Sequence, residues 1–428
     1  MRKLNIFITL LFTLLLVFSC GDFASREADG YGGGDGKYHG DGGTSASSPE
    51  AGDSGYEGED DGDKQSQNKP SPGQLTAGEW SDIKNYDYYL KLFLRNDGAE
   101  VEESQRRTGF SRFINYFGFE TRFMVAVNVV SGGKPVNDAD VELSDSDGLL
   151  FTAKTDVRGN AYLFPYYDLD GEDITVKVTS GDNEKTTQFV YDALEDLQIT
   201  LDDKEDTQSV LDIMFVIDTT GSMGDEIRYL KEEIDDVISR ISEANPNYTI
   251  NLALLFYRDI GDDYVTRYFD FTTNITAQKV NLSKQSANGG GDFPEAVDIA
   301  LKEAVAKKWS AGNATRLIFH VCDAPPHDKQ NNVTVFFNAV KTAAQKGIRI
   351  IPVASSGIDL ETEYLLRQEA LMTGGTYIFL TDDSGIGDSH QEPTIGEYVV
   401  EYLNACMARV VNEYLTGVET EPVPYFGQ

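Results

Sequence analysis

Three separate stretches of this sequence place carboxylate or hydroxyl side chains where they could bind a metal ion. The first is Asp218-Thr219-Thr220-Gly221-Ser222, in which oxygen-bearing side chains occupy positions i, i+2 and i+4. Such hard oxygen ligands suit Mg²⁺, Mn²⁺ or Ca²⁺ better than zinc. Taken alone, the same loop is equally typical of a helix N-cap, because Ser and Thr favour that position. This first stretch therefore leaves both interpretations open.

Two later loops favour the metal interpretation. A run of three glycines leads into Asp292, ahead of Pro294 and a predicted helix, and Pro suits the first helical turn because its φ is fixed. The third loop follows an apolar run that ends at Asp323. Three loops that follow strands can thus each offer an oxygen ligand to one ion. The predicted metal ligands are Asp218, Thr220, Ser222, Asp292 and Asp323.

Other polar side chains near these loops are given structural or open roles. His320 lies inside a predicted strand and is expected to be a core histidine. Asp259 ends another predicted strand, and we expect it to orient ligands without binding the ion itself. His327 and Asp328 could either support the site or belong to the loop surface. His390 stands alone in a late acidic loop, and a single His identifies no site.

These loops must be positioned by an alternation of apolar strands and helices that begins near Val210. The alternation predicts a mostly parallel sheet flanked by helices, and ligands collect at the carboxyl ends of the strands in such folds. Residues 211–217 are apolar without strict alternation, as expected for a strand covered on both faces. Further predicted strands are 251–257, 317–322, 348–353 and 376–380. The predicted helices are 225–243, 294–307, 333–346, 361–372 and 395–414.

The three loops in this order resemble the metal-ion-dependent adhesion site of the von Willebrand factor A (vWA) family, whose pattern is Asp-x-Ser-x-Ser, then Thr, then Asp. Asp218 and Ser222 match the first and last positions of the first loop, and Thr220 keeps the hydroxyl of the middle Ser. Asp323 matches the final Asp, whereas Asp292 stands where the family has Thr. The sequences Asp-Thr-Thr-Gly-Ser-Met and Gly-Gly-Gly-Asp-x-Pro-Glu are similar to those of hemicentin-type vWA domains.

The resemblance implies a Rossmann-like α/β vWA domain over residues 208–416 that binds one divalent cation, Mg²⁺ first, with Mn²⁺ or Ca²⁺ as alternatives. In the family, an acidic side chain of a partner protein fills an open coordination position, which implies metal-dependent protein binding of the adhesion type. The third carboxylate, Asp292, is expected to strengthen cation affinity but to weaken the attraction for that partner. An alternative is a structural envelope protein whose cation only stabilises the fold.

The N-terminus resembles a bacterial lipoprotein signal. Basic residues precede an apolar run, residues 4–18, that is too short to span a bilayer. The run ends near Cys20, which would become a lipidated N-terminus; a plain secretion signal and an uncleaved anchor are the rival interpretations. We expect a signal over residues 1–20 and attachment to a bacterial envelope, at the outer membrane or cell surface, through the lipid alone. Residues 21–73 are rich in Gly, Asp, Glu and Ser, which predicts a disordered acidic tether.

Two segments separate the tether from the predicted α/β domain. Residues 74–120 are rich in aromatic side chains and are predicted to form a small subdomain. Residues 121–203 contain short alternating runs between Gly- and Asp-rich turns, which predicts a β-sandwich with strands at 123–129, 174–178 and 197–201. This segment resembles the immunoglobulin-like carboxypeptidase regulatory-like domain through GKPVNDADVEL and TDVRGNAYLF. Residues 417–428 are predicted to be a C-terminal tail.

Charge and motif content argue against several functions. With 71 Asp and Glu against 36 Lys and Arg, the chain carries a formal charge of −35, so nucleic acid would be repelled. The sequence has no zinc-protease, Gly-x-Ser-x-Gly or paired catalytic carboxylate motif, so we expect no enzyme. A hydrolase that activates water with the metal is the alternative. Cys322 and Cys406 are expected to be separate buried thiols rather than a disulfide.

Overall fold

The computed structural model describes residues 70–93, 109–193, 197–202, 209–224, 226–387 and 389–426. Cys20, the predicted signal over residues 1–20 and nearly all of the predicted tether lie outside the described residues. Within the described ranges, no helix has the length and apolar character needed to cross a membrane.

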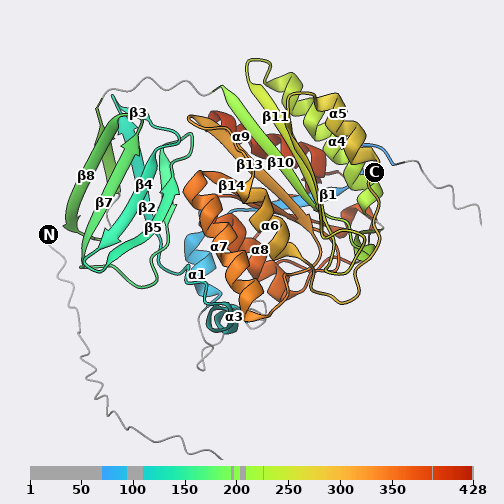
Figure 1. Cartoon of the computed structure of the whole chain (residues 1–428), viewed down its shortest axis with the longest axis horizontal. Coiled ribbons are helices and arrows are strands. Elements are labelled where there is room, and N and C mark those ends of the chain that lie inside the picture. Colours follow the sequence, from blue (N-terminus) through green and yellow to red (C-terminus); the bar gives the residue numbers. More distant parts are fainter. Residues whose placement is uncertain are drawn as a thin grey trace, which may run out of the picture. The chain divides into compact units, whose positions relative to one another are not determined.

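A mixed sheet flanked by helices forms the larger part of the described structure (Figure 1). Its eight strands, in sheet order, are β12 (Thr266–Thr272), β11 (Thr249–Tyr257), β10 (Val210–Asp218), β13 (Ala314–Cys322), β14 (Ile348–Ala354), β15 (Tyr377–Leu380), β1 (Thr76–Trp80) and β16 (Glu401–Tyr402). The run from β11 to β15 is parallel throughout, whereas β12, β1 and β16 pair antiparallel with their neighbours. The predicted α/β fold with a largely parallel sheet is therefore confirmed.

Helices cover both faces of this sheet (Figure 1). Those on one face are α4 (Ile227–Ala244), α5 (Ile275–Ser283) and α9 (Leu403–Thr416). Those on the other face are α6 (Val297–Ala306), α7 (Gln330–Lys346) and α8 (Leu360–Thr373). Side chains of β10 alternate between the two buried clusters: Ile213 and Phe215 join one, Met214 and Val216 the other. The predicted two-sided burial of this strand is confirmed, and each such side chain contributes about 1.5–3 kcal/mol by burial.

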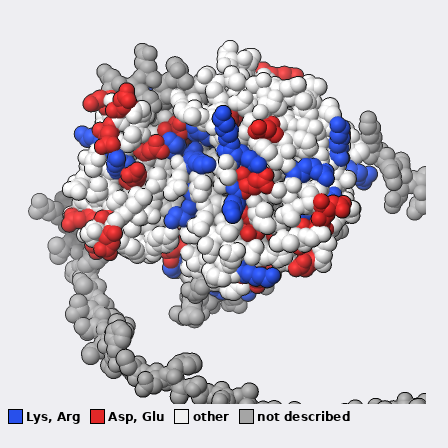
Figure 2. Space-filling model, in the orientation of Figure 1, with Lys and Arg blue, Asp and Glu red and all other residues white. Residues whose placement is uncertain are grey.

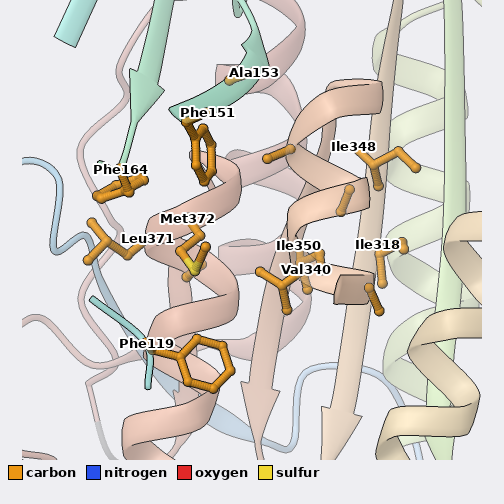
Figure 3. Close-up of a cluster of buried hydrophobic side chains, with 14 of the residues drawn as sticks. Phe119, Phe151, Ala153, Phe164, Ile318, Val340, Ile348, Ile350, Leu371 and Met372 are labelled. Atoms are coloured by element: carbon orange, nitrogen blue, oxygen red, sulfur yellow. The ribbon is translucent and has the colours of Figure 1, made fainter. Parts of the chain in front are cut away.

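Two further four-stranded sheets occupy residues 125–201. One contains β3 (Lys134–Pro135), β2 (Val125–Ser131), β6 (Asn160–Leu163) and β9 (Leu197–Leu201). The other contains β5 (Gly148–Lys154), β4 (Asp140–Asp145), β7 (Asp173–Ser180) and β8 (Asn183–Val190). Alternate side chains of β7 are buried, as expected for a strand with one face in a core. Phe151 and Phe164 meet edge to face and join Leu371 and Met372 of α8 in one buried cluster (Figure 3).

The described parts of the aromatic segment 74–120, predicted to form a small subdomain, contribute to the main sheet and its core. β1 lies between β15 and β16 as an antiparallel strand. The short helix α1 (Tyr86–Lys91) and the helix α3 (Phe110–Phe117) follow it. Phe110 and Phe113 each lie with their ring centroid 5.2 Å from that of Tyr364 in α8. Elements this short cannot bury their apolar faces alone, so they pack on the larger domain.

The predicted helix over residues 395–414 is wrong at its N-terminal end. α9 begins at Leu403, and the two residues before it pair with β1 as the strand β16. The strand partner comes from the other end of the described chain, so no local pattern could reveal this pairing. The other helices and strands predicted after Val210 all overlap observed ones, and the 3-10 turns η1 (Gly221–Gly224) and η2 (Asp382–Ser384) complete the domain.

A buried ion pair ties the N-terminal segment to α8. Arg367 is fully buried, and its guanidinium donates to both carboxylate oxygens of Asp82 at 2.6 and 2.8 Å. A further N–H of Arg367 donates to Glu363 at 3.1 Å. A charge taken out of water is tolerated only when such partners compensate it. The contact therefore fixes the segment that carries β1 against the helical layer.

We expect Asp82→Ala to lower the free energy of unfolding by about 3–5 kcal/mol, because the buried Arg367 charge loses its bidentate partner. Urea-induced unfolding followed by circular dichroism measures this loss. Asp87→Ala, at an exposed position of α1, is the matched control and should change stability by less than about 0.5 kcal/mol. Equal stability of the two variants would contradict the role given to this ion pair.

Candidate functional site

The candidate site lies where two neighbouring parallel strands send the chain to opposite faces of the sheet. β10 leads through η1 into α4 on one face, and β13 leads into α7 on the other. Such a switch point leaves a crevice at the carboxyl ends of the strands, where ligands bind in open α/β sheets. Asp218 ends β10, and Asp323 follows the last residue of β13. Because Ile217 pairs with Val321, the two carboxylates meet at this edge.

Hydrogen bonds hold the first loop in one conformation. The Thr220 backbone N–H and hydroxyl both donate to Asp218 Oδ1, at 2.8 and 2.7 Å. The Thr220 hydroxyl lies 3.2 Å from Ser222 Oγ, and Ser222 hydrogen-bonds Asp323. Four of the five residues that the sequence predicts as metal ligands are therefore connected to one another.

A buried carboxylate that was not predicted as a ligand lies beside this loop. Glu295 is only 3% exposed. A methyl group placed on Gly290 would lie 2.9 Å from Glu295 Oε1 and 3.4 Å from Thr220 Cβ, so this carboxylate approaches the first loop across the glycine. The Glu295 backbone N–H donates to the Pro325 carbonyl at 3.0 Å, which ties it to the loop that follows Asp323.

Asp292, the fifth predicted ligand, is exposed, and its place as a ligand stays a prediction. The glycines before it contact the first loop. Gly289 and Gly290 have φ values of 82° and 75°, which glycine adopts without a steric penalty. The Gly221 N–H donates to the Gly289 carbonyl at 3.0 Å, so the glycine run before Asp292 contacts the first loop. Asp292 and Glu295 belong to one short motif, and spacing alone does not show which carboxylate turns inward.

Three carboxyl groups of the site are buried without a basic partner. The ion pairs found among the described residues include none to Asp218, Glu295 or Asp323. Burial, and next the repulsion of Asp323, raises the pKa of Asp218 to about 7. Burial likewise raises the pKa of Asp323 to about 6, and burial together with Asp218 raises the pKa of Glu295 to about 9. Holding all three carboxylates ionised therefore requires positive charge nearby.

One oxygen of each carboxylate is also buried without a hydrogen-bond partner among the described residues: Asp218 Oδ2, Glu295 Oε2 and Asp323 Oδ1. Buried polar atoms are nearly always partnered, so such oxygens indicate an ion, a ligand or water. Carboxylate and hydroxyl oxygens are the ligands of hard divalent cations, so this set fits one. The described ranges contain no group of three His, Cys, Asp or Glu side chains placed to hold a metal ion. The hydroxyls of Thr220 and Ser222 would therefore have to contribute.

Side chains around the site are mostly paired with one another. His320 is buried, as predicted, and its Nδ1 lies 2.8 Å from Glu369 Oε2. His327 Nε2 lies 2.8 Å from Asp259 Oδ1, which gives both residues a structural partner next to the site. Asp328 is exposed. These contacts pair neither histidine with the three carboxylates described above.

The cysteines and the last histidine lie apart from the metal-ligand candidates. Cys322 and Cys406 are both buried and free, so the prediction of two separate thiols is confirmed. His390 is not isolated as its sequence context indicated: its ring lies 2.8 Å from Asp382 and 3.3 Å from Glu226. Glu226 in turn helps to raise the pKa of Asp323. The acidic loop of η2 is thus connected to the start of α4.

A cavity of about 710 Å³ lies away from the three carboxylates and has a different character. Its lining includes Lys154 and Arg316, and these pair with Asp140 and Asp138. Figure 2 shows the same mixing on one face of the molecule, where Lys and Arg side chains lie among Asp and Glu. The cavity therefore lacks the buried, unpaired charge that marks the switch point.

Comparison with known proteins identifies the family that this fold and site resemble. The family model of the von Willebrand factor A domain matches residues 212–381. The matched range runs from β10 to the residue after β15, and it includes every residue of the candidate site.

Two curated relatives match about half of the chain. A putative ariadne-like RING finger protein of Acanthamoeba polyphaga mimivirus is 26% identical over 230 residues, covering 50% of this chain and 22% of the relative. The alpha-protein kinase vwkA of Dictyostelium discoideum is 24% identical over 190 residues, covering 44% of this chain and 30% of the relative. The chain thus spans less than a third of the length of either relative.

Two solved structures are similar over about half of the chain. BatB, a conserved hypothetical protein from Bacteroides thetaiotaomicron, has a TM-score of 0.34 at 13% identity, covering 48% of this chain and 98% of that one. An aerotolerance-related membrane protein from Bacteroides fragilis has a TM-score of 0.30 at 14% identity, with the same two coverages.

Proposed function

We propose that the von Willebrand factor A domain present in this chain is a protein-binding module of the adhesion type that requires a bound divalent cation. The observation that carries this proposal is the group of buried, unpartnered carboxylate oxygens at the switch point. Asp218 and Asp323 would hold the cation, and the hydroxyls of Thr220 and Ser222 would complete its coordination directly or through water. Mg²⁺ is the first candidate, and Mn²⁺ or Ca²⁺ would suit the same oxygen ligands.

The proposed partner is a protein that presents an acidic side chain to this cation. Ser222 is exposed, so one side of the first loop is open to solvent. A divalent cation that keeps a coordination position on this side would attract a carboxylate oxygen. Binding of this kind needs no chemical step, and we propose that the chain is not an enzyme.

A second candidate function is structural, with a cation that only stabilises the fold. The burial of the site favours it: Asp218 is 0%, Glu295 3% and Asp323 4% exposed. Side chains so far from solvent offer a partner little surface of their own. The adhesion candidate predicts that removing the cation also releases a partner protein, whereas the structural candidate predicts no such release.

We also propose that a lipid on Cys20 attaches the chain to a bacterial envelope and that residues 21–73 act as a tether. The support is the apolar run at residues 4–18 followed by this cysteine. Cys20→Ala is expected to lose labelling by an alkyne-tagged palmitate analogue and to leave the membrane fraction. Cys406→Ala, which removes a buried thiol, is the control and should retain both. Unchanged labelling of Cys20→Ala would contradict lipidation.

For the metal, we expect excess Mg²⁺ or Mn²⁺ to raise the melting temperature of the chelator-treated protein. A cation at 100 times its dissociation constant stabilises the folded state by about 2.7 kcal/mol. Asp218→Ala should abolish the shift, whereas Asp383→Ala, at an exposed position, should retain it. Differential scanning fluorimetry measures both. A wild-type melting temperature that is the same in EDTA and in each cation would refute the metal requirement.

For the partner, we expect the immobilised full chain to retain a specific envelope or host protein in Mg²⁺ and to release it in EDTA. Asp218→Ala bait should fail to retain the same protein, while Asp383→Ala should succeed. Mass spectrometry of the eluates identifies and quantifies the difference. If the cation shifts the melting temperature but all baits and buffers retain the same proteins, the structural candidate replaces the adhesion candidate.

A further inference from the structure

The cavity of about 710 Å³ lies at the opposite edge of the main sheet from the switch point. One wall includes Gly312 and Arg316, around the start of β13, and Lys346, the last residue of α7 before β14. The other wall comes from the sheet of β5, β4, β7 and β8 and includes Lys154 and Thr179. Figure 1 shows β5 beside α7 at this junction. A cavity of this size between two packed layers is typical of a small-molecule site.

Polar contacts join the two walls of the cavity. Arg316 is only 4% exposed, and its guanidinium donates to both carboxylate oxygens of Asp138 at 2.8 and 3.1 Å. Arg349 donates to the Lys154 carbonyl at 2.7 Å. Asp138 has a φ of 59°, and among the described residues it is the one non-glycine residue with a positive φ. Such strained conformations are concentrated at ligand sites, and the contacts of Asp138 fix the walls before any ligand binds.

The lining of the cavity reverses the charge balance of the chain. In the whole sequence, 71 Asp and Glu stand against 36 Lys and Arg. Five basic and two acidic residues line the cavity, namely Lys154, Lys307, Lys308, Arg316 and Lys346 against Asp138 and Asp140. An excess of one charge sign in a hollow raises the local concentration of ions of the other sign. The cavity therefore attracts an anion, although the chain as a whole repels one.

Two of the five basic side chains have no carboxylate partner. The other three are neutralised by the two lining acids and by Glu303; these are Arg316, Lys154 and Lys307. The ion pairs found among the described residues include none to Lys308 or Lys346, and both side chains are exposed. The Lys346 ammonium donates to the Val305 carbonyl at 2.7 Å, and this bond leaves its charge in place. Two positive charges are thus available to a ligand in the cavity.

We propose that this cavity binds a small molecule that carries a phosphate monoester, and that the ammonium groups of Lys308 and Lys346 bind the phosphate. A phosphate monoester carries a charge of about −1.5 to −2 at neutral pH, which matches two ammonium groups, whereas a carboxylate carries a single charge. Lysine binds phosphate as a point charge and requires no bidentate geometry. Thr179 and Trp309, which also line the cavity, would contact the rest of the ligand. This site goes beyond the proposed function and needs no cation.

The test is the dissociation constant of glucose 6-phosphate, measured by isothermal titration calorimetry on the full chain in EDTA, so that no metal ion bridges the phosphate to the protein. Glucuronate, a sugar of similar size with one negative charge, should bind at least tenfold more weakly. The double variant Lys308→Gln, Lys346→Gln removes both available charges, and we expect it to weaken glucose 6-phosphate binding at least tenfold. The double variant Lys284→Gln, Lys302→Gln makes the same change at two exposed lysines outside the lining and should alter the constant less than twofold.

Three results would overturn the proposal: equal affinity for glucuronate, an equal loss of affinity in both double variants, or no saturable binding of glucose 6-phosphate and inorganic phosphate to wild type. Should circular dichroism show the Lys308→Gln, Lys346→Gln variant to be unfolded, Lys308→Gln alone replaces it, because that side chain is exposed. Weaker binding by this single variant upholds the proposal, and wild-type affinity overturns it. Asp218→Ala should bind glucose 6-phosphate as wild type does, so the failure of this site and that of the proposed cation site are distinguishable.

Discussion

A buried carboxylate is stable only where something compensates its charge, and this chain places three of them at one edge of its main sheet. β10 and β13 pair in parallel in the core of the sheet. This pairing brings Asp218, at the end of β10, and Asp323, directly after β13, to the same edge. Elsewhere, the buried Asp82 is neutralised internally by Arg367. At the switch point, the ion pairs of the described residues include no such base for Asp218, Glu295 or Asp323.

Backbone conformation brings the loops of the candidate site together as much as side chains do. Gly290 has a positive φ and no side chain, and both properties let Glu295 approach the first loop. The Thr220 backbone N–H and hydroxyl take up one oxygen of Asp218, which leaves the other oxygen free. In the proposed cation complex, this second oxygen would be available to the ion. Ligands held in this way would lower the reorganisation that binding requires.

The sequence predicts those parts of the molecule that local patterns determine. Asp218 and Asp323 end apolar strands, so their meeting at a sheet edge follows from the α/β alternation. The burial of Glu295 beside the first loop does not follow from any local pattern, because its contact is with Gly290 and the loop after β13. Nor does the position of β1, whose partners β15 and β16 lie at the far end of the described chain. In the sequence, aromatic residues such as Phe110 indicate a small core of their own. In the fold, Phe110 packs against Tyr364 of α8.

The number of carboxylates around the cation also bears on which function the domain performs. Two carboxylates balance the charge of a divalent ion, and an incoming acidic side chain still meets a neutral site. Three carboxylates exceed that charge by one, so the attraction for a partner carboxylate weakens while the ion is held more tightly. In the proposed cation complex, a third acidic ligand would therefore favour tight cation binding at the expense of partner binding. The adhesion candidate then requires the exposed surface beside Ser222 to contact the partner protein directly, whereas the structural candidate requires no such contact.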